Sequence, residues 1–349
     1  MGARLALAMM VAAAALAGAA PPKPPTRLFS DDQPIHATLR GPITAIVATP
    51  ANSRAARPAV LQLQAPVAET HAIQLSPRGL LRRTKVACQF PPLRIEFTAK
   101  PPAQSLFERQ KRLKLVTHCR NLASHQQLVL LEYAAYRMLA LVMPTGLRAR
   151  LGSFDYVEQS GRPIASRAGF LLEDPDDAAA RNGLVEVRTM GRLSPSQLDP
   201  AWSARAAMFE YMIGNLDWSM RAGPAGDTCC HNFRLFGGAA SAVSGIIPVP
   251  YDFDVSGLVN PPYALPPDGM GLNSVRERRY RGYCVHNAQA YAAAAEFRAK
   301  QGQLVGILSA IPQLEEGRQR KAAAYLEDFF RDISTDEDVR KRLLKTCIN

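Results

Sequence analysis

Three polar clusters in the second half of the chain contain residue types that suit a hard metal cation. They are Gly214-Asn215-Leu216-Asp217-Trp218, His231-Asn232-Phe233 and Tyr251-Asp252-Phe253-Asp254. Carboxylate and amide oxygens are the ligands that Mg²⁺ prefers, and Mg²⁺ commonly bridges protein carboxylates to the phosphates of a substrate. Together with a lysine elsewhere, the clusters predict a phosphoryl-transfer site. Taken singly, each cluster is more typical of a helix cap or a turn.

The region before these clusters is patterned as β-structure. Apolar and polar residues alternate there in short runs, and Pro and Gly interrupt the runs. Alternation with a period of two is typical of half-buried strands. We therefore predict an antiparallel, β-rich N-terminal lobe over residues 35–173. Its expected strands include residues 71–75, 93–97, 153–157 and 169–173.

Helical spacing of apolar residues follows the early strands. It predicts a helix over residues 126–142, which Ser124 is placed to cap and Pro144 to end. Helical patterns then dominate, so we predict a mainly helical C-terminal lobe over residues 174–349 and an α+β protein as a whole. The expected elements of this lobe are a helix at 201–213, a short strand at 246–251 and three helices within 287–346.

The N-terminus has the pattern of an export signal. An apolar run and small residues follow Arg4, so residues 1–19 are predicted to be a signal peptide that is cleaved after Ala19. The alternative, a retained anchor, would need about 20 apolar residues with interfacial flanks. Residues 20–34 are rich in proline and predict a linker without a packed core.

No later segment is long and apolar enough to span a bilayer, because charged residues interrupt the Ala-rich stretches near the C-terminus. We therefore expect a periplasmic or extracellular protein that does not span the membrane. The export signal also disfavours nucleic acid as a partner.

The sequence contains six cysteines, an even number that an oxidising compartment tends to pair. Their spacings match no zinc pattern, and the adjacent Cys229 and Cys230 lack the CxxC spacing. Structural disulfides are therefore favoured over a metal or redox site. Cys88 precedes one expected strand and Cys119 follows another, so a bridge between these two residues is the pair that we expect.

Charge is distributed unevenly along the chain. Residues 20–120 hold 16 Lys or Arg against 5 Asp or Glu, whereas residues 121–349 hold 25 of each. The basic first third predicts either a surface for anions, such as phosphates, acidic polymers or a membrane face, or a solvated β-domain. A second basic run, at 276–281, is expected either to dock an acidic or phosphorylated substrate or to begin a solvated helix.

In their order, these motifs resemble the CotH family of secreted, kinase-like proteins first known from bacterial spore coats. The resemblance covers about residues 70–260 and implies a two-lobe fold like that of protein kinases. The motifs that carry it are Arg78-Gly79, the strand at 111–115, the helix at 131–136, the strand pair ending at Glu173, and the GNLDW and YDFD clusters.

Carried over to this chain, the resemblance implies that Lys114 holds nucleotide phosphates and that Glu132 is the helix carboxylate paired with it. Asp217 is similar to the catalytic carboxylate that accepts the proton of the attacking hydroxyl. Each assignment has an alternative. Lys114 would otherwise point outward from a basic strand, and Asp217 would otherwise belong to a turn at a helix end.

The resemblance also implies that Asn232 and Asp252 bind the Mg²⁺ or Mn²⁺ that accompanies ATP. Asp254 would add a second contact, because residues two apart on an extended strand face the same way. The chain departs from the protein-kinase pattern in two respects. It has no GxGxxG loop, for which residues 76–79 are the only candidate substitute, and Asp217 and Asn232 are 15 residues apart instead of about five.

The leading hypothesis is a secreted kinase-like protein that transfers a phosphoryl group from a Mg²⁺- or Mn²⁺-nucleotide. The acceptor would be a hydroxyl of a secreted or envelope protein or of a polysaccharide. The alternative is a catalytically inactive envelope binding or scaffold protein with the same fold. A third candidate is an envelope module that binds acidic polymers through the basic β-rich lobe and needs no nucleotide.

Overall fold

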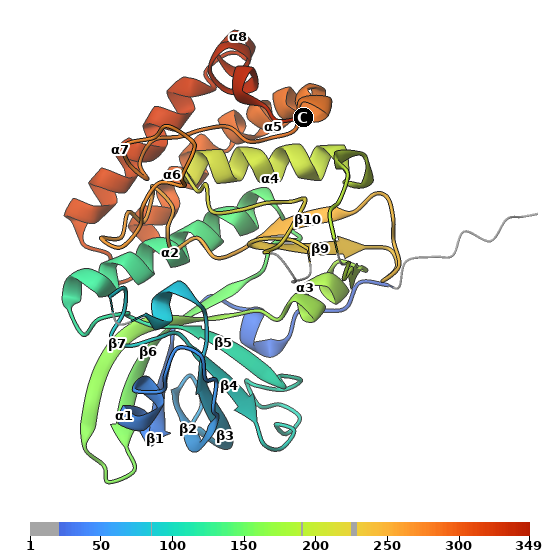
Figure 1. Cartoon of the computed structure of the whole chain (residues 1–349). Helices are drawn as coiled ribbons and strands as arrows, with labels where there is room; N and C mark the ends of the chain where they lie inside the picture. Colours follow the sequence, from blue (N-terminus) through green and yellow to red (C-terminus); the bar gives the residue numbers. More distant parts are fainter. Residues whose placement is uncertain (1–20, 85, 190, 225–228) are drawn as a thin grey trace, which may run out of the picture.

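The computed structural model describes residues 21–84, 86–189, 191–224 and 229–349. They form an α+β protein in which a β-barrel, at the bottom of Figure 1, precedes a more helical C-terminal part. The predicted signal peptide, residues 1–19, lies outside the described residues. No helix among the residues described is long and apolar enough to cross a membrane.

The N-terminal part contains most of the strands. Its elements are β1 (Ile35–Gly41), α1 (Ile43–Val47), β2 (Arg57–Ala65), β3 (Glu69–Pro77), β4 (Leu93–Phe97), β5 (Arg112–Val116), α2 (Ala123–Val142), β6 (Ala149–Glu158) and β7 (Pro163–Leu172). The elements of the C-terminal part are α3 (Pro175–Arg181), β8 (Val185–Glu186), α4 (Pro200–Ile213), β9 (Phe233–Gly237), β10 (Ile247–Pro250), α5 (Asn287–Ala299), α6 (Gln301–Ala310), α7 (Glu316–Asp332) and α8 (Asp336–Asp338).

Seven strands close into a barrel in the order β1-β2-β3-β4-β5-β7-β6. Neighbouring strands are antiparallel except at the closing seam, where β1 and β6 pair in parallel from Ile35 opposite Gly152 to Gly41 opposite Glu158. The prediction of a wholly antiparallel lobe is therefore wrong at this seam. The seam joins strands that are distant in sequence, and alternation along a strand does not specify which distant strand becomes its neighbour.

The barrel core is built from the inward-facing residues of each strand. In β2, for example, Leu61 and Leu63 are buried, and each such side chain contributes about 1.5–3 kcal/mol relative to an exposed one. Leu28 and Phe29 are buried in the same core. The described part of the predicted linker, residues 21–34 of 20–34, thus differs from the expectation, because a short turn within it contributes side chains to the barrel.

Helix α2 lies between the barrel and the helical part, as Figure 1 shows, and contacts β6, β7, α4 and α6. Apolar residues cover nearly all of its surface, which is typical of a helix packed on several sides. The helix was expected at 126–142 and begins earlier, at Ala123. Ser124 does not cap it, because the N-cap is Leu122 and no side chain bonds to the first turn there.

The C-terminal part combines helices with a small sheet in the order β10-β9-β8. The helix predicted at 201–213 is α4, and its N-terminus is fixed by the Asp199 carboxylate, which accepts a hydrogen bond from Trp202 N at 2.9 Å. The strand predicted at 246–251 is β10, which pairs with β9 in an antiparallel hairpin. This hairpin lies between α4 and the barrel in Figure 1.

All six cysteines form disulfides, which join Cys88 to Cys119, Cys229 to Cys230 and Cys284 to Cys347. The predicted Cys88–Cys119 bridge is confirmed. Full pairing is the state that an oxidising, extracytoplasmic compartment favours.

Candidate functional site

The segment that contains Asp217 begins where α4 ends. Gly214 caps this helix in a left-handed conformation (φ 64°), which glycine adopts without a steric penalty. A side chain at this position would also collide with the Tyr325 hydroxyl. Because the helix stops at Gly214, the chain can turn and bring Asp217 beside the residues that precede β9.

Two side chains hold the backbone around Asp217. Asn215 Oδ1 accepts a hydrogen bond from Asp217 N at 3.1 Å. Arg281 Nη1 donates to the carbonyl oxygens of Leu216 and Trp218 at 2.7 and 3.0 Å, and its guanidinium stacks on the Trp218 ring. The loop is therefore fixed on both sides of Asp217, although the Asp217 side chain itself is half exposed.

The Asp217 carboxylate contacts the polar cluster before β9. Its Oδ1 lies 2.7 Å from His231 Nε2, and its Oδ2 accepts a hydrogen bond from Asn232 Nδ2 at 3.1 Å. The hydrogen bond to Asp217 raises the pKa of His231 against the opposing effect of burial. Each carboxylate oxygen has a second lone pair, so Asp217 keeps the capacity to accept a hydrogen bond from a further hydroxyl.

Asn232 and Asp252 lie at the same end of the β9–β10 hairpin, where Tyr251 N donates to Asn232 O at 3.0 Å. Both residues have a left-handed backbone, with φ of 53° and 69°. Non-glycine residues with positive φ are uncommon, and strained backbone of this kind clusters at functional sites. The conformation at Asp252 also ends the extended geometry of β10. The alternation that was expected to align Asp252 with Asp254 therefore does not apply.

Two of these residues fit a divalent cation. The Asp252 side chain is 40% exposed, and the one ion pair that it forms within the described ranges, to Arg82, is long at 3.8 Å. The Asn232 amide nitrogen is used by Asp217, which leaves the Asn232 amide oxygen for a cation. One carboxylate and one amide oxygen suit Mg²⁺ or Mn²⁺, which are usually held by few protein ligands together with waters and substrate phosphates. Asp252 and Asn232 would hold the ion.

Glu132 and Asp254 lie on the far side of Asp252 and contact a different cation. Glu132, in α2, is 2% exposed and accepts hydrogen bonds from both terminal nitrogens of Arg82 at 3.3 and 3.4 Å. Asp254 Oδ2 lies 3.0 Å from Arg82 Nε and accepts a hydrogen bond from the Tyr263 hydroxyl. The predicted pairing of Glu132 with Lys114 is therefore wrong, since the cation that Glu132 contacts is Arg82.

Burial dominates the electrostatics of this group. It raises the pKa of Glu132 and of Asp254, while the Arg82 guanidinium lowers both. Burial alone would lower the pKa of Arg82, but Asp254 and Glu132 together raise it well above its ordinary value. Arg82 is therefore a permanent cation, whereas burial outweighs its influence on its partners and leaves the pKa values of Glu132 and Asp254 raised above their ordinary values.

The strongest charged neighbours of Lys114 are the cations Arg78 and Arg234, and Asp252 and Asp174 act on it more weakly in the opposite direction. Lys114 Nζ is 5.2 Å from the centre of the Tyr251 ring, and the Arg234 guanidinium contacts the same ring at 5.0 Å. Burial, together with the neighbouring Arg78 and Arg234, lowers the pKa of Lys114 to about 7. Among the described residues, neither Lys114 nor Arg78 forms an ion pair. The alternative of an outward, solvated Lys114 does not hold, because the side chain is largely buried.

A cavity of about 330 Å³ opens beside Lys114, between β5 and β7 of the barrel and the β8–β9 pair. Its cationic lining is Arg94, Arg112, Lys114, Arg188 and Arg234. Its apolar lining is Leu113, Leu172, Pro175, Val187 and Phe233. The lining also contains the carboxylates Asp174 and Glu186, which pair with Arg112 and with Arg188 and Arg234, respectively. The cavity therefore combines an apolar wall with cations that are largely paired, and Lys114 is the lining cation that forms no ion pair among the described residues.

A chain of contacts joins all six predicted site residues. Lys114 contacts the Tyr251 ring, and Tyr251 hydrogen-bonds to Asn232 and precedes Asp252 in the chain. Asn232 hydrogen-bonds to Asp217. Arg82 forms ion pairs with Asp252, Glu132 and Asp254. The structure brings the six residues into one region between the barrel and the helical part. No group of three or more His, Cys, Asp or Glu side chains in the described ranges is arranged to hold a metal ion.

Two residues of the site were not predicted from the sequence. They are Arg82 and Arg281, which holds the loop around Asp217. Arg82 is followed by Arg83, which points away and donates to the carbonyl oxygens of Pro50 and Ser53. Nothing in the local pattern distinguishes the two neighbouring arginines. The only usable signal was the excess of carboxylates over cations in the predicted site, which calls for a further positive charge nearby.

No protein-family model matches this chain, and a search of the curated proteins finds no match either. The function of the site is therefore inferred from its own geometry.

Proposed function

We propose that the protein is a secreted, kinase-like phosphotransferase of the CotH-like kind, with a two-lobe plan like that of protein kinases. The order of the elements supports this plan. A strand with a buried lysine, β5, is followed by helix α2 and the strand pair β6–β7, and Asp217, Asn232 and Asp252 then follow helix α4.

The observation that carries the proposal is that cations without an ion pair among the described residues lie near two oxygen ligands, the exposed Asp252 carboxylate and the buried Asn232 amide. Among the residues that the structure describes, Lys114 and Arg78 form no ion pair, and burying a charge without one is unfavourable unless a ligand supplies the counter-charge. Asp252 adjoins Tyr251 in the chain, Tyr251 N donates to Asn232 O, and the Asp252 carboxylate and the Asn232 amide oxygen are the groups that would hold a metal. A nucleotide triphosphate with Mg²⁺ or Mn²⁺ satisfies the cations and these oxygens at once.

In this proposal each residue has a separate role. Lys114 and Arg78 bind phosphate oxygens, and the apolar wall of the cavity contacts the base. Asp252 and Asn232 hold the metal ion, which neutralises charge on the transferring phosphoryl group. Arg281 keeps the loop around Asp217 in place.

Asp217 orients the acceptor hydroxyl and takes its proton. The hydroxyl oxygen forms a bond to the terminal phosphorus while the bond to the diphosphate leaving group breaks. The half-exposed Asp217 side chain is accessible to a large acceptor, which fits a hydroxyl on a secreted or envelope protein or on a polysaccharide. A periplasmic or extracellular site of action agrees with the complete pairing of the cysteines.

The test is calorimetric titration of ATP with Mg²⁺ or Mn²⁺ into the wild type and Asp252→Ala. We expect the substitution to lower the metal-dependent affinity by at least about tenfold, because it removes the one carboxylate free for the ion. Asp268→Ala is the matched control, since Asp268 is an exposed aspartate in a loop and should leave the affinity unchanged. Absence of any metal-dependent nucleotide binding by the wild type would refute the proposal.

A catalytically inactive envelope scaffold is the second candidate. The hydrogen bonds from His231 and Asn232, which already occupy both Asp217 oxygens, favour it. Transfer of labelled phosphate from ATP to envelope extracts separates the two. The phosphotransferase should lose transfer but keep nucleotide binding in Asp217→Ala, because Asp217 acts in the chemical step. A scaffold should bind nucleotide or acceptor without any transfer by the wild type.

A further inference from the structure

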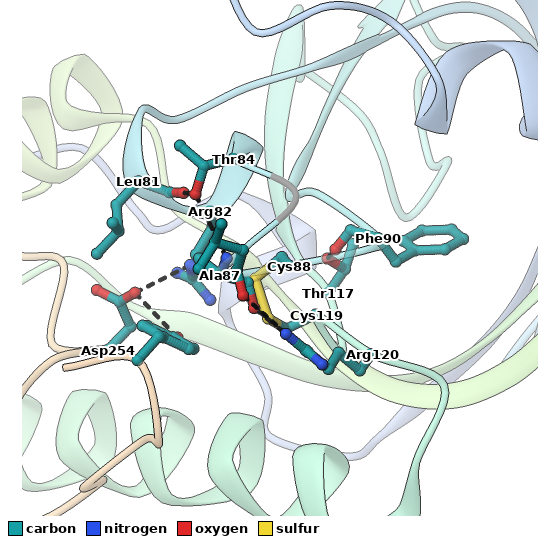
Figure 2. Close-up of a disulfide and its surroundings, with 12 residues drawn as sticks. Leu81, Arg82, Thr84, Ala87, Cys88, Phe90, Thr117, Cys119, Arg120 and Asp254 are labelled. Carbon is teal, nitrogen blue, oxygen red and sulfur yellow. Dashed lines mark hydrogen bonds and ion pairs between the residues drawn. A yellow bond between two sulfur atoms is a disulfide. The ribbon is translucent and has the colours of Figure 1, made fainter.

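Arg82 occupies the place where the three carboxylates of the site face one another. It lies in a short turn after β3, and Figure 2 shows its guanidinium directed at Asp254. Its side chain is 7% exposed. Nε contacts Asp254, and the two terminal nitrogens contact Glu132, so all three nitrogens of the guanidinium face carboxylates. Two parallel N–H···O contacts to one carboxylate add geometric specificity to the ion pair.

The turn that contains Arg82 is attached covalently to the barrel. The Cys88–Cys119 disulfide joins its far end to the segment after β5, as Figure 2 shows, with a Cα–Cα distance of 4.7 Å. Arg120 Nη2 adds a hydrogen bond to Val86 O at 2.7 Å. The disulfide limits the conformations of this segment, so the position of Arg82 is built into the fold.

The three carboxylates differ in what remains available to a ligand. Side-chain exposure is 2% at Glu132, 11% at Asp254 and 40% at Asp252. A metal ion bound to Glu132 or Asp254 would have to displace the guanidinium. That displacement would leave Arg82 buried without a partner, which is strongly unfavourable. Asp252, at 3.8 Å from Arg82, is the most exposed carboxylate of the three.

We propose that Arg82 is the built-in counter-cation of Glu132 and Asp254, so that the site takes one divalent cation, at Asp252 and Asn232. Asp254 then positions Arg82 and is not a metal ligand, in contrast to the expectation from the sequence. This inference rests on the proposed function for its metal and nucleotide, and it adds the number of metal ions and the residue that limits it.

The first test counts metal ions in the wild type. Mn²⁺ is titrated into the full chain with a saturating, non-hydrolysable ATP analogue, and free Mn²⁺ is followed by electron paramagnetic resonance. We expect one Mn²⁺ per bound nucleotide. Two Mn²⁺ per nucleotide would overturn the inference, because the second ion would require the place that Arg82 occupies.

The second test compares two isosteric substitutions two residues apart, Asp252→Asn and Asp254→Asn. Asp252→Asn should lower the Mn²⁺ affinity by about tenfold or more, whereas Asp254→Asn should change it by less than about threefold. Circular dichroism checks that each variant is folded. An equal loss of affinity in the two variants would identify Asp254 as a ligand and would overturn the inference.

A third measurement separates failure of the inference from failure of the proposed function. Without nucleotide, Arg82→Gln should bind Mn²⁺ about tenfold more tightly than the wild type at pH 8, because Glu132 and Asp254 lose their counter-cation. An unchanged Mn²⁺ affinity in a folded Arg82→Gln protein would overturn the inference. Absence of nucleotide binding in the first test, with this gain present, would instead remove the proposed function and leave the role of Arg82 standing.

Discussion

Two buried cations from the barrel reach the same site and have opposite surroundings. Arg82 contacts Glu132, Asp252 and Asp254, which together raise its pKa. Lys114 forms no ion pair within the described part of the chain, and burial beside other cations lowers its pKa to about 7.

Arg82 is a charge that the fold itself neutralises, whereas Lys114 is a charge that a bound anion would neutralise. A guanidinium enclosed by carboxylates is already satisfied and contributes to stability only as long as all its partners remain. An ammonium with no partner is unfavourable in the empty protein and becomes favourable when an anion binds.

The largest expected effect contrasts the stability of two substitutions. Arg82→Met should lower the free energy of unfolding by about 3–5 kcal/mol, because it leaves Glu132 and Asp254 buried without a counter-charge. Lys114→Met should not lower it and is expected to raise it, since the substitution removes a buried amine whose protonation is unfavourable in the folded protein. Urea unfolding at pH 7.5 measures both, and equal losses in the two variants would contradict the comparison.

The next effect concerns the disulfide that fixes the Arg82 turn. Replacing Cys88 and Cys119 by alanine should lower the free energy of unfolding by about 3 kcal/mol. The same change at Cys284 and Cys347 should cost a similar or slightly larger amount, because that bridge closes a longer stretch of chain and the loop-closure cost rises only slowly with length. Only the first pair should also change the number of Mn²⁺ ions bound per nucleotide, from one to two. If both double variants bound a second Mn²⁺, or if neither did, the Cys88–Cys119 disulfide would not be what fixes the position of Arg82.

Much of the fold could be predicted from the sequence, because strands and helices have local periodicity. The strand predicted at 93–97 is β4, and the helix predicted at 126–142 is α2 with an earlier start. The positions of Asp217 after α4 and of Asp252 after β10 were predicted in the same way. The parallel seam between β1 and β6 could not be predicted, since it depends on a distant pairing. The candidate site residues could be chosen from the sequence by their residue types. Their contact partners, such as Arg82 for Glu132, could not be predicted.

The basic run at 276–281 is another segment whose contacts could not be predicted from the sequence. It was expected to dock an anionic substrate or to begin a solvated helix. In the structure it forms no helix, and two of its arginines turn inward. Arg278 donates to the Met212 and Tyr325 carbonyl oxygens, and Arg281 holds the loop around Asp217. Charge alone does not distinguish an arginine that faces solvent from one that satisfies buried carbonyl groups.

The smallest expected effect is the uptake of a proton when nucleotide binds to Lys114. Because the pKa of Lys114 in the empty protein is about 7, most molecules carry a neutral Lys114 at pH 8.5. Phosphate oxygens stabilise the charged form, so binding should draw about one proton from the buffer at this pH. Calorimetry in two buffers of different ionisation enthalpy measures this number directly. Lys114→Met should bind more weakly and take up no proton, whereas Lys100→Met, an exposed lysine in a loop, should behave as the wild type.

The same shift determines how stability depends on pH in the absence of ligand. An unfolded chain keeps the Lys114 proton up to about pH 10.5, whereas the folded protein releases it near pH 7. Between these values the unfolded state binds more protons, so the contribution of Lys114 to stability rises with pH across this window. Below pH 7 both states are protonated and the contribution is constant at its least favourable value. Lys114→Met should lack the rise, and this is measured by subtracting its urea midpoints from those of the wild type between pH 6.5 and 9.5. If the difference is flat over this range, Lys114 is paired in the folded protein and its contrast with Arg82 disappears.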